Sequence, residues 1–117
     1  MSEEAWVEPA RAVLLELRAG QMPPRDAQRA AVKGALAALV QRAPGRSVEV
    51  RIPPFAAVQA VEGATHRRGT PPAVVEMDAG TWLALALGEL RWADALTGGR
   101  VRASGARSDL SGLLPLT

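Results

Sequence analysis

The segment VVEMDAGTWLALALGEL, residues 74–90, decides the fold. It starts with the apolar, β-branched pattern of a short strand and continues through Asp78 into a run from Trp82 to Leu87 that is apolar on every side. An aspartate at this place accepts hydrogen bonds from the free amides of a helix start, so Asp78 is predicted to cap the helix. A helix on a protein surface keeps one polar face. The segment therefore predicts a strand followed by a helix that the rest of the chain covers all round.

The remaining elements follow from the period of the apolar residues, which is close to 3.6 in helices and two in half-buried strands. Proline and glycine residues mark where each element ends. The expected elements are helices over 8–19 and 25–42, strands over 47–52, 55–62, 73–78 and 100–105, and a short helical turn around Trp92. The strands over 55–62 and 73–78 are expected to pair as a hairpin with a loop of about ten residues. This pattern predicts an α+β fold.

Length and composition predict one folded domain. The chain has 117 residues, of which 48% are hydrophobic and 22% charged, whereas disordered chains combine low hydrophobicity with high net charge. The domain is expected to span 1–117, with N-terminal helices in 1–45 and the sheet with the apolar helices in 46–117. The formal net charge is only +2 and Lys33 is the only lysine, so we expect no nucleic-acid partner.

No catalytic or metal site is expected. Cysteine is absent, so a cysteine-based zinc site is excluded. His66 is the only histidine, and the sequence shows no partner residues with which it could activate a nucleophile. General acid-base chemistry would need carboxylates, but each candidate has a structural interpretation. Asp78 is interpreted as a helix cap, Glu76 as part of the solvent-exposed face of a strand, and Glu89 and Asp94 as surface residues. We therefore expect a non-enzyme without a cofactor. An acidic N-terminus and the lack of an apolar run of about 18 residues favour a cytoplasmic protein without a transmembrane segment.

Residues 74–90 together with RWADALTGGRVRASG, residues 91–105, resemble the sterol carrier protein-2 superfamily, in a compact bacterial variant of the actinobacterial type. The resemblance extends over 48–116. It implies a mainly antiparallel sheet of four to five strands with helices packed on one face and, in lipid-carrying members, an apolar tunnel between them. It also implies that the helix over 25–42 is the long N-terminal helix of the family and that the helix over 8–19 is an addition. Family members commonly have a phenylalanine where Leu96 stands, and their strands are longer, so a smaller cavity or none is expected here.

The apolar helix and the apolar C-terminus lead to two functional hypotheses. The first is non-catalytic binding of an apolar ligand, such as a fatty acyl chain, an acyl-CoA or a sterol-like lipid, between helices and sheet. The ligand would contact Trp82, Leu83, Leu85, Leu87, Trp92, Leu96, Leu110, Leu113 and Leu114. The second hypothesis is a protein-interaction or accessory domain with the same fold and a solid core, as a monomer or a homodimer. An empty apolar cavity of about 300 Å³ would cost roughly 7 kcal/mol, so such a site must be collapsed, small or occupied.

Three further segments have a structural and a functional interpretation. The basic loop around His66, Arg67 and Arg68 offers guanidinium groups to an anionic head group or an acidic membrane surface, but a solvated loop is favoured. Trp6 is expected to pack on the first helix rather than contact a partner. The leucine-rich C-terminus is expected to dock on an apolar surface of the protein.

Overall fold

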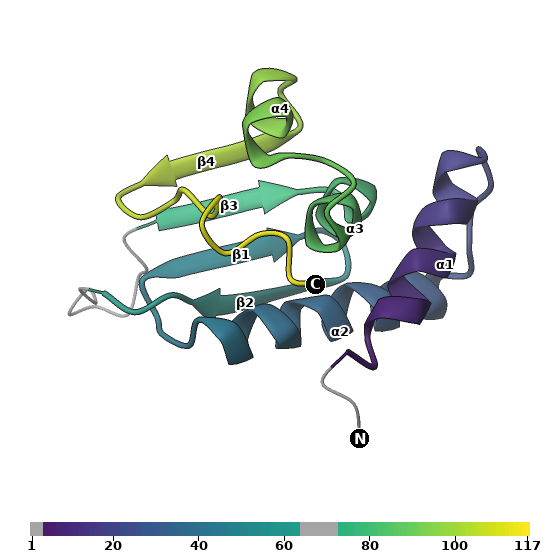
Figure 1. The fold of residues 1–117 in the computed structure, drawn as a ribbon, viewed down its shortest axis with the longest axis horizontal. Helices are drawn as coiled ribbons and strands as arrows, with labels where there is room; N and C mark the ends of the chain where they lie inside the picture. The colour runs from purple at the N-terminus through teal and green to yellow at the C-terminus, as the bar shows by residue number, and fades with distance from the viewer. Residues whose placement is uncertain (1–3, 64–72) are drawn as a thin grey trace.

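The computed structural model describes residues 4–63 and 73–117. Within these ranges the elements follow in the order α1 (Val7–Arg18), α2 (Arg25–Arg42), β1 (Val48–Ile52), β2 (Ala56–Ala60), β3 (Ala73–Met77), α3 (Ala79–Leu87), α4 (Trp92–Thr97) and β4 (Val101–Gly105) (Figure 1). The helices and strands expected from the periodicity are thus confirmed, with ends shifted by a few residues. The basic loop around His66 lies outside the described residues.

The strands form a mixed sheet with the order β2-β1-β3-β4. β1 pairs antiparallel with β2 and parallel with β3, and β3 pairs antiparallel with β4. The expected hairpin between the second and third strands is therefore wrong, because β1 lies between them. The tight hairpin is instead β1–β2, whose turn is closed by a hydrogen bond of 2.9 Å from the Phe55 amide to the Ile52 carbonyl. Sequence spacing alone favoured pairing of strands that follow one another in the chain, whereas β3 lies inside the sheet and forms hydrogen bonds with a strand on each side, β1 and β4.

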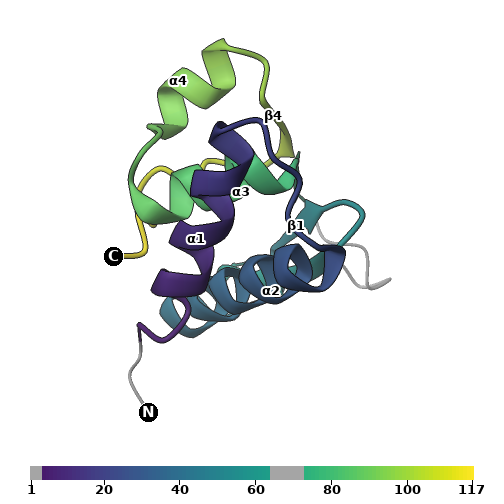
Figure 2. The same ribbon diagram turned by 90° about the vertical axis from the view of Figure 1, so that its right-hand side faces the viewer.

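The helices cover one face of this sheet (Figure 2). The side chains of β1 alternate accordingly: Val48, Val50 and Ile52 are buried, whereas Arg51 is exposed. β3 shows the same period of two. The expected α+β fold with a mostly antiparallel sheet and helices on one face is confirmed.

The apolar helix α3 lies at the centre of this layer. Asp78 caps it, accepting a hydrogen bond of 2.8 Å from the Thr81 amide. Every α3 residue except Gly80 is buried, and the Trp82 indole N–H points to the Val32 carbonyl of α2 at 3.4 Å. The helix ends at Gly88 in the left-handed conformation, with φ of 81°. The prediction of a helix covered all round is confirmed.

The C-terminal segment closes the core beside α3 (Figure 1). Leu110 and Leu116 are buried, and the Leu116 amide donates a hydrogen bond of 2.9 Å to the Ala86 carbonyl. The Arg42 guanidinium of α2 donates to the carbonyls of Leu113, Pro115 and Leu116 at 2.8 to 3.1 Å. The expected docking of this apolar segment is therefore confirmed.

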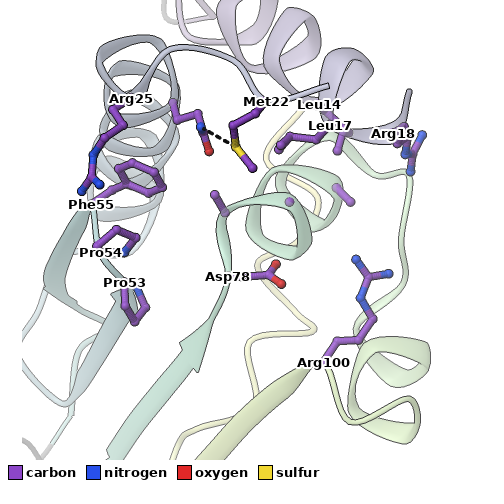
Figure 3. A pocket seen from close by; sticks show the side chains of 14 residues that line it. Leu14, Leu17, Arg18, Met22, Arg25, Pro53, Pro54, Phe55, Asp78 and Arg100 are labelled. Atoms are coloured by element: carbon purple, nitrogen blue, oxygen red, sulfur yellow. Dashed lines mark hydrogen bonds between the residues drawn. The ribbon is translucent and has the colours of Figure 1, made fainter. Parts of the chain in front are cut away.

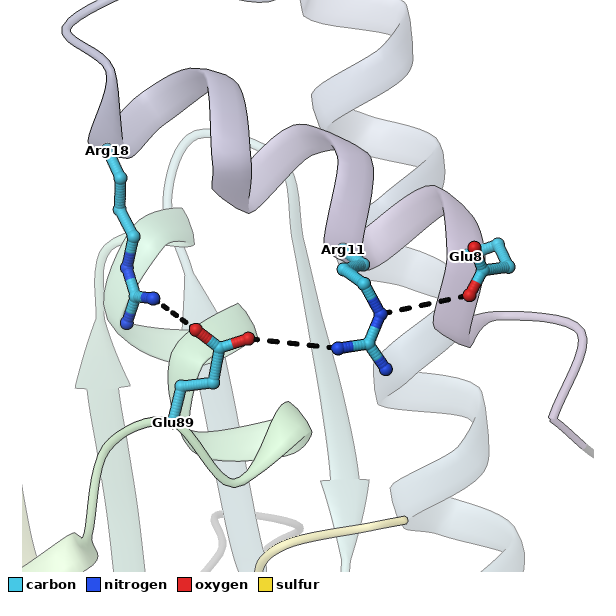
Figure 4. A network of polar contacts seen from close by, with 4 residues as sticks. All are labelled: Glu8, Arg11, Arg18 and Glu89. Carbon is cyan, nitrogen blue, oxygen red and sulfur yellow. Dashed lines mark hydrogen bonds and ion pairs between the residues drawn. The ribbon is translucent and has the colours of Figure 1, made fainter.

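Helix α1 packs on α2 and α3. Trp6, just before α1, is buried, and a Cβ atom on Gly34 of α2 would lie only 3.2 Å from the Trp6 Cβ. Trp6 is thus packed inside the protein, but the neighbour given by this close approach is α2 and not the first helix, on which it was expected to pack. Glu89, which follows α3, forms ion pairs with Arg11 and Arg18 of α1 (Figure 4). In the part of the chain that the structure describes, no helix is long and apolar enough to cross a bilayer.

Candidate functional site

One end of the sheet gathers residues from three separate parts of the chain. β1 and β3 run parallel, so their carboxyl ends lie at the same end of the sheet, where Pro53 and Asp78 follow them. β4 runs antiparallel to β3 and pairs Val101 with Met77, which brings Arg100 to this end as well. The topology thus places a proline, a carboxylate and a guanidinium beside one another in the fold.

The turn between α1 and α2 forms the opposite wall. The buried Gln28 side chain fixes this turn, since its amide nitrogen donates to the Pro23 carbonyl at 2.8 Å and contacts the Met22 sulfur at 3.3 Å (Figure 3). Between the turn and the sheet end lies an open cleft of about 840 Å³. Its lining residues are Leu14, Leu17, Arg18, Met22, Arg25, Gln28, Pro53, Pro54, Phe55, Asp78, Ala79, Gly80, Ala84 and Arg100.

The cleft combines an apolar wall with a mostly cationic set of charges. Leucines of α1, Met22 and the Pro53–Phe55 turn supply the apolar wall, and Met22 is 79% exposed. A methionine side chain is flexible and polarizable, so it adapts to apolar ligands of different shape. Three arginines and one aspartate supply the charges. The aspartate, Asp78, already accepts from the Thr81 amide as the α3 cap.

Gly80, in the first turn of α3, lines the cleft opposite Leu17 of α1. A Cβ atom on Gly80 would lie 3.8 Å from Leu17 Cδ1 and 3.8 Å from Asp78 Oδ1, which is ordinary van der Waals contact. A small added side chain therefore fits at this position. A large one would project into the cleft.

Most of the site residues expected from the sequence lie in the core. Trp82, Leu83, Leu85 and Leu110 are fully buried, and Leu87 is buried with them. They belong to the same hydrophobic cluster as the inner residues of the sheet. The cleft at the sheet end touches α3 through its first turn and Ala84 instead.

Two of the expected residues, Trp92 and Leu114, line a second depression of about 310 Å³ between α4 and the C-terminal segment. The Trp92 side chain is buried, and its indole nitrogen has no hydrogen-bond partner among the described residues. Leu113 is half-buried, and Leu96 is 42% exposed. The structure therefore brings part of the expected set together and leaves Leu96 at the surface.

Sequence reasoning missed the residues of the larger cleft because they are scattered along the chain and come together only through the strand order. One usable signal was the position of Pro53 and Asp78 directly after two buried strands. Interpreting this signal required knowing that β1 pairs in parallel with β3. The expected hairpin between the second and third strands pointed to a different arrangement.

Groups with shifted pKa values lie away from the cleft. Hydrogen bonds from Ser111 lower the pKa of Asp109, and the hydrogen bond with Glu49 raises the pKa of Arg51. Neither residue lines the cleft. Within residues 4–63 and 73–117, no group of three His, Cys, Asp or Glu side chains is placed to hold a metal ion. The side chains that line the cleft offer apolar contact and charge.

A four-stranded mixed sheet with four helices on one face, among the described residues, is the architecture of the sterol carrier protein-2-like proteins. The chain belongs to this group: the model of the family described as bacterial SCP ortholog matches residues 24–116. The family resemblance expected from residues 74–105 is thus confirmed, and the match includes the long helix α2. Helix α1 lies before the matched segment. No curated protein matches the chain.

Proposed function

We propose that this protein binds an apolar small molecule, such as a fatty acyl chain, an acyl-CoA or a sterol-like lipid, without catalysing a reaction. The observation that carries this proposal is the cleft of about 840 Å³ with its apolar wall, in a member of the bacterial SCP family. Ligand pockets for small molecules measure roughly 300 to 1,000 Å³ and are lined mainly by apolar side chains. The size and lining of the cleft support this function.

The energetics favour a ligand with a long apolar chain. Each buried methylene contributes about 0.8 kcal/mol, whereas association costs on the order of 4 to 15 kcal/mol in lost freedom of motion. A ligand that buries about ten methylenes would therefore bind measurably, and a short one would not. Because the cleft is open to solvent, an empty state needs no dry void inside the protein.

The decisive experiment uses Gly80, because this residue lines the cleft and has no side chain of its own. Thermal shift and calorimetry with lauric and palmitic acid should show binding to the unaltered protein. Gly80→Phe should abolish binding by filling the cleft, whereas the matched control Gly80→Ala should retain it. Equal binding by both variants would place the ligand elsewhere.

We keep the residues around Trp92 as a second proposed location, which is supported by the Trp92 indole N–H in the smaller depression, a donor with no partner in the described part of the chain. Ser111 lines that depression and is exposed. Ser111→Phe should block binding there and Ser111→Ala should not. Comparing these variants with the Gly80 pair assigns the ligand to one of the two places.

The alternative function is a protein-interaction or accessory domain with a solid core. The fully buried side chains of α3 and the exposure of two large apolar residues, Leu15 and Leu96, favour it. Light scattering and native mass spectrometry test this alternative. Lack of lipid binding, together with a dimer that Leu15→Arg or Leu96→Arg dissociates, would support it over lipid binding.

A further inference from the structure

The charged side chains of the cleft differ in how far they are already engaged inside the protein. Arg18 forms an ion pair with Glu89, and Asp78 is held by the Thr81 amide. The Arg25 side chain makes no hydrogen bond or ion pair with any residue in 4–63 or 73–117. Arg100 uses only its Nε atom, which donates to Thr81 Oγ1 at 3.2 Å. Its two terminal nitrogens have no partner within the same described ranges.

The two less engaged arginines come from elements far apart in the sequence, yet both line the apolar cleft. Figure 3 shows Arg25 on one side of the cleft, next to the Pro53–Phe55 turn, and Arg100 on the opposite side. Guanidinium groups bind carboxylates and phosphates through paired hydrogen bonds, which are stronger than those between neutral groups. An apolar wall between two guanidinium groups suits a ligand with an apolar chain and an acidic head group.

We propose that the cleft selects amphiphiles with an acidic head group, a carboxylate or a phosphate, over neutral and cationic ones of the same chain length. Either Arg25 or Arg100 binds the head group, depending on which side of the cleft the head group occupies, while the leucines of α1, Met22 and Phe55 contact the chain. This inference rests on the proposed lipid-binding function. It narrows the ligand from any apolar molecule to an anionic amphiphile.

The test compares ligands with one twelve-carbon chain and different heads: laurate, dodecyl phosphate, dodecanol and dodecyltrimethylammonium, all below their micelle concentrations. Calorimetry should show laurate and dodecyl phosphate binding about tenfold or more tightly than dodecanol, the gain expected from charge-assisted hydrogen bonds. The cationic ligand should bind most weakly. Added salt should reduce the preference by screening the exposed arginines.

The double variant Arg25→Gln with Arg100→Gln should bind all four ligands with similar affinity. The matched control is Arg29→Gln with Arg46→Gln, which removes two positive charges from residues outside the cleft that pair with Asp26 and Gln59. The control should keep the preference for acidic heads. Circular dichroism melting of both double variants checks that they fold.

The outcomes separate this inference from the function on which it rests. If none of the four ligands binds, the proposed lipid binding fails. If all four bind equally to the unaltered protein, lipid binding stands and the selection of acidic heads is overturned. If the control loses the preference as much as the cleft variant, the assignment of head-group binding to Arg25 and Arg100 is overturned.

Discussion

The core around α3 and the cleft beyond its first turn are built from similar apolar side chains, yet the core is closed and the cleft is open. The core forms where extended faces meet: the inner face of the sheet, α2 and the C-terminal segment all contribute to one hydrophobic cluster. The cleft forms where elements end, between the α1–α2 turn, the Pro53–Phe55 turn and the start of α3. Side chains on the faces of helices and strands interdigitate along the whole element and exclude space. The ends of elements carry caps and turns, whose polar groups pack less closely and leave a cleft.

The largest expected difference between the core and the cleft is the loss of stability when a leucine is shortened to alanine. Leu85→Ala removes a fully buried side chain and should lower the free energy of unfolding by about 2 to 5 kcal/mol. Leu17→Ala, at a half-buried cleft position, should lower it by less than about 1 kcal/mol. Urea denaturation followed by circular dichroism measures both. Similar losses in the two variants would mean that the cleft is packed as tightly as the core.

The two glycines at the ends of α3 offer a second contrast. Gly88 has φ of 81°, and a Cβ atom there would lie 3.2 Å from Pro115, so Gly88→Ala should destabilise the protein by about 1 to 2 kcal/mol. Gly80→Ala has room and should be neutral or stabilising by up to about 1 kcal/mol. Thermal unfolding of both variants provides the measurement. A destabilised Gly80→Ala variant would show that the cleft wall has no space for a methyl group.

A third prediction concerns the C-terminal segment that closes the core. Arg42→Gln removes hydrogen bonds to three carbonyls of this segment and should cost about 1 kcal/mol, because the arginine itself is exposed to water. Hydrogen exchange should increase at the Leu116 amide, which bonds to Ala86. Unchanged exchange there would mean that apolar contacts alone hold the segment.

The smallest effect is expected on the side of α1 next to the cleft. Glu89→Gln weakens the ion pairs with Arg11 and Arg18, which are half exposed, and should lower stability by about 0.2 to 1 kcal/mol. The loss should shrink in high salt, because screening already weakens these pairs in the unaltered protein. A matched variant, Asp26→Asn, breaks the exposed pair with Arg29 away from the cleft and should cost no more. A salt-independent loss for Glu89→Gln would point to packing instead.

Much of the fold was predictable because local signals were strong. Asp78 before an apolar run marked the start of α3, and the alternation from Val48 to Ile52 marked a strand with one buried face. The capping bond joins residues three positions apart, so the sequence shows it directly, and the apolar composition of α3 indicated that the helix would be buried. The family followed from the same segment and its continuation through Gly105.

The cleft was not predictable in the same way, since it depends on which strand ends meet. Arg25 and Arg100 are 75 positions apart in the sequence and line the same cleft because β4 pairs with β3 and α2 packs against β2 and α3. The expected hairpin placed the third strand beside the second and hid this juxtaposition. Likewise, apolarity of the α3 helix did not distinguish a packed core from a ligand tunnel.

The amino-acid sequence by itself determined the α+β class, the positions of the helices and strands, the cap of α3 and the membership in the sterol carrier protein-2-like group, because these rest on short-range patterns of apolar and polar residues. Only the tertiary structure decided the strand order, the closed packing around Trp82 and the open cleft at the sheet end. The physical reason is that pairing and packing depend on contacts between distant segments. Such contacts are set by the competition of all buried surfaces at once and not by any one segment.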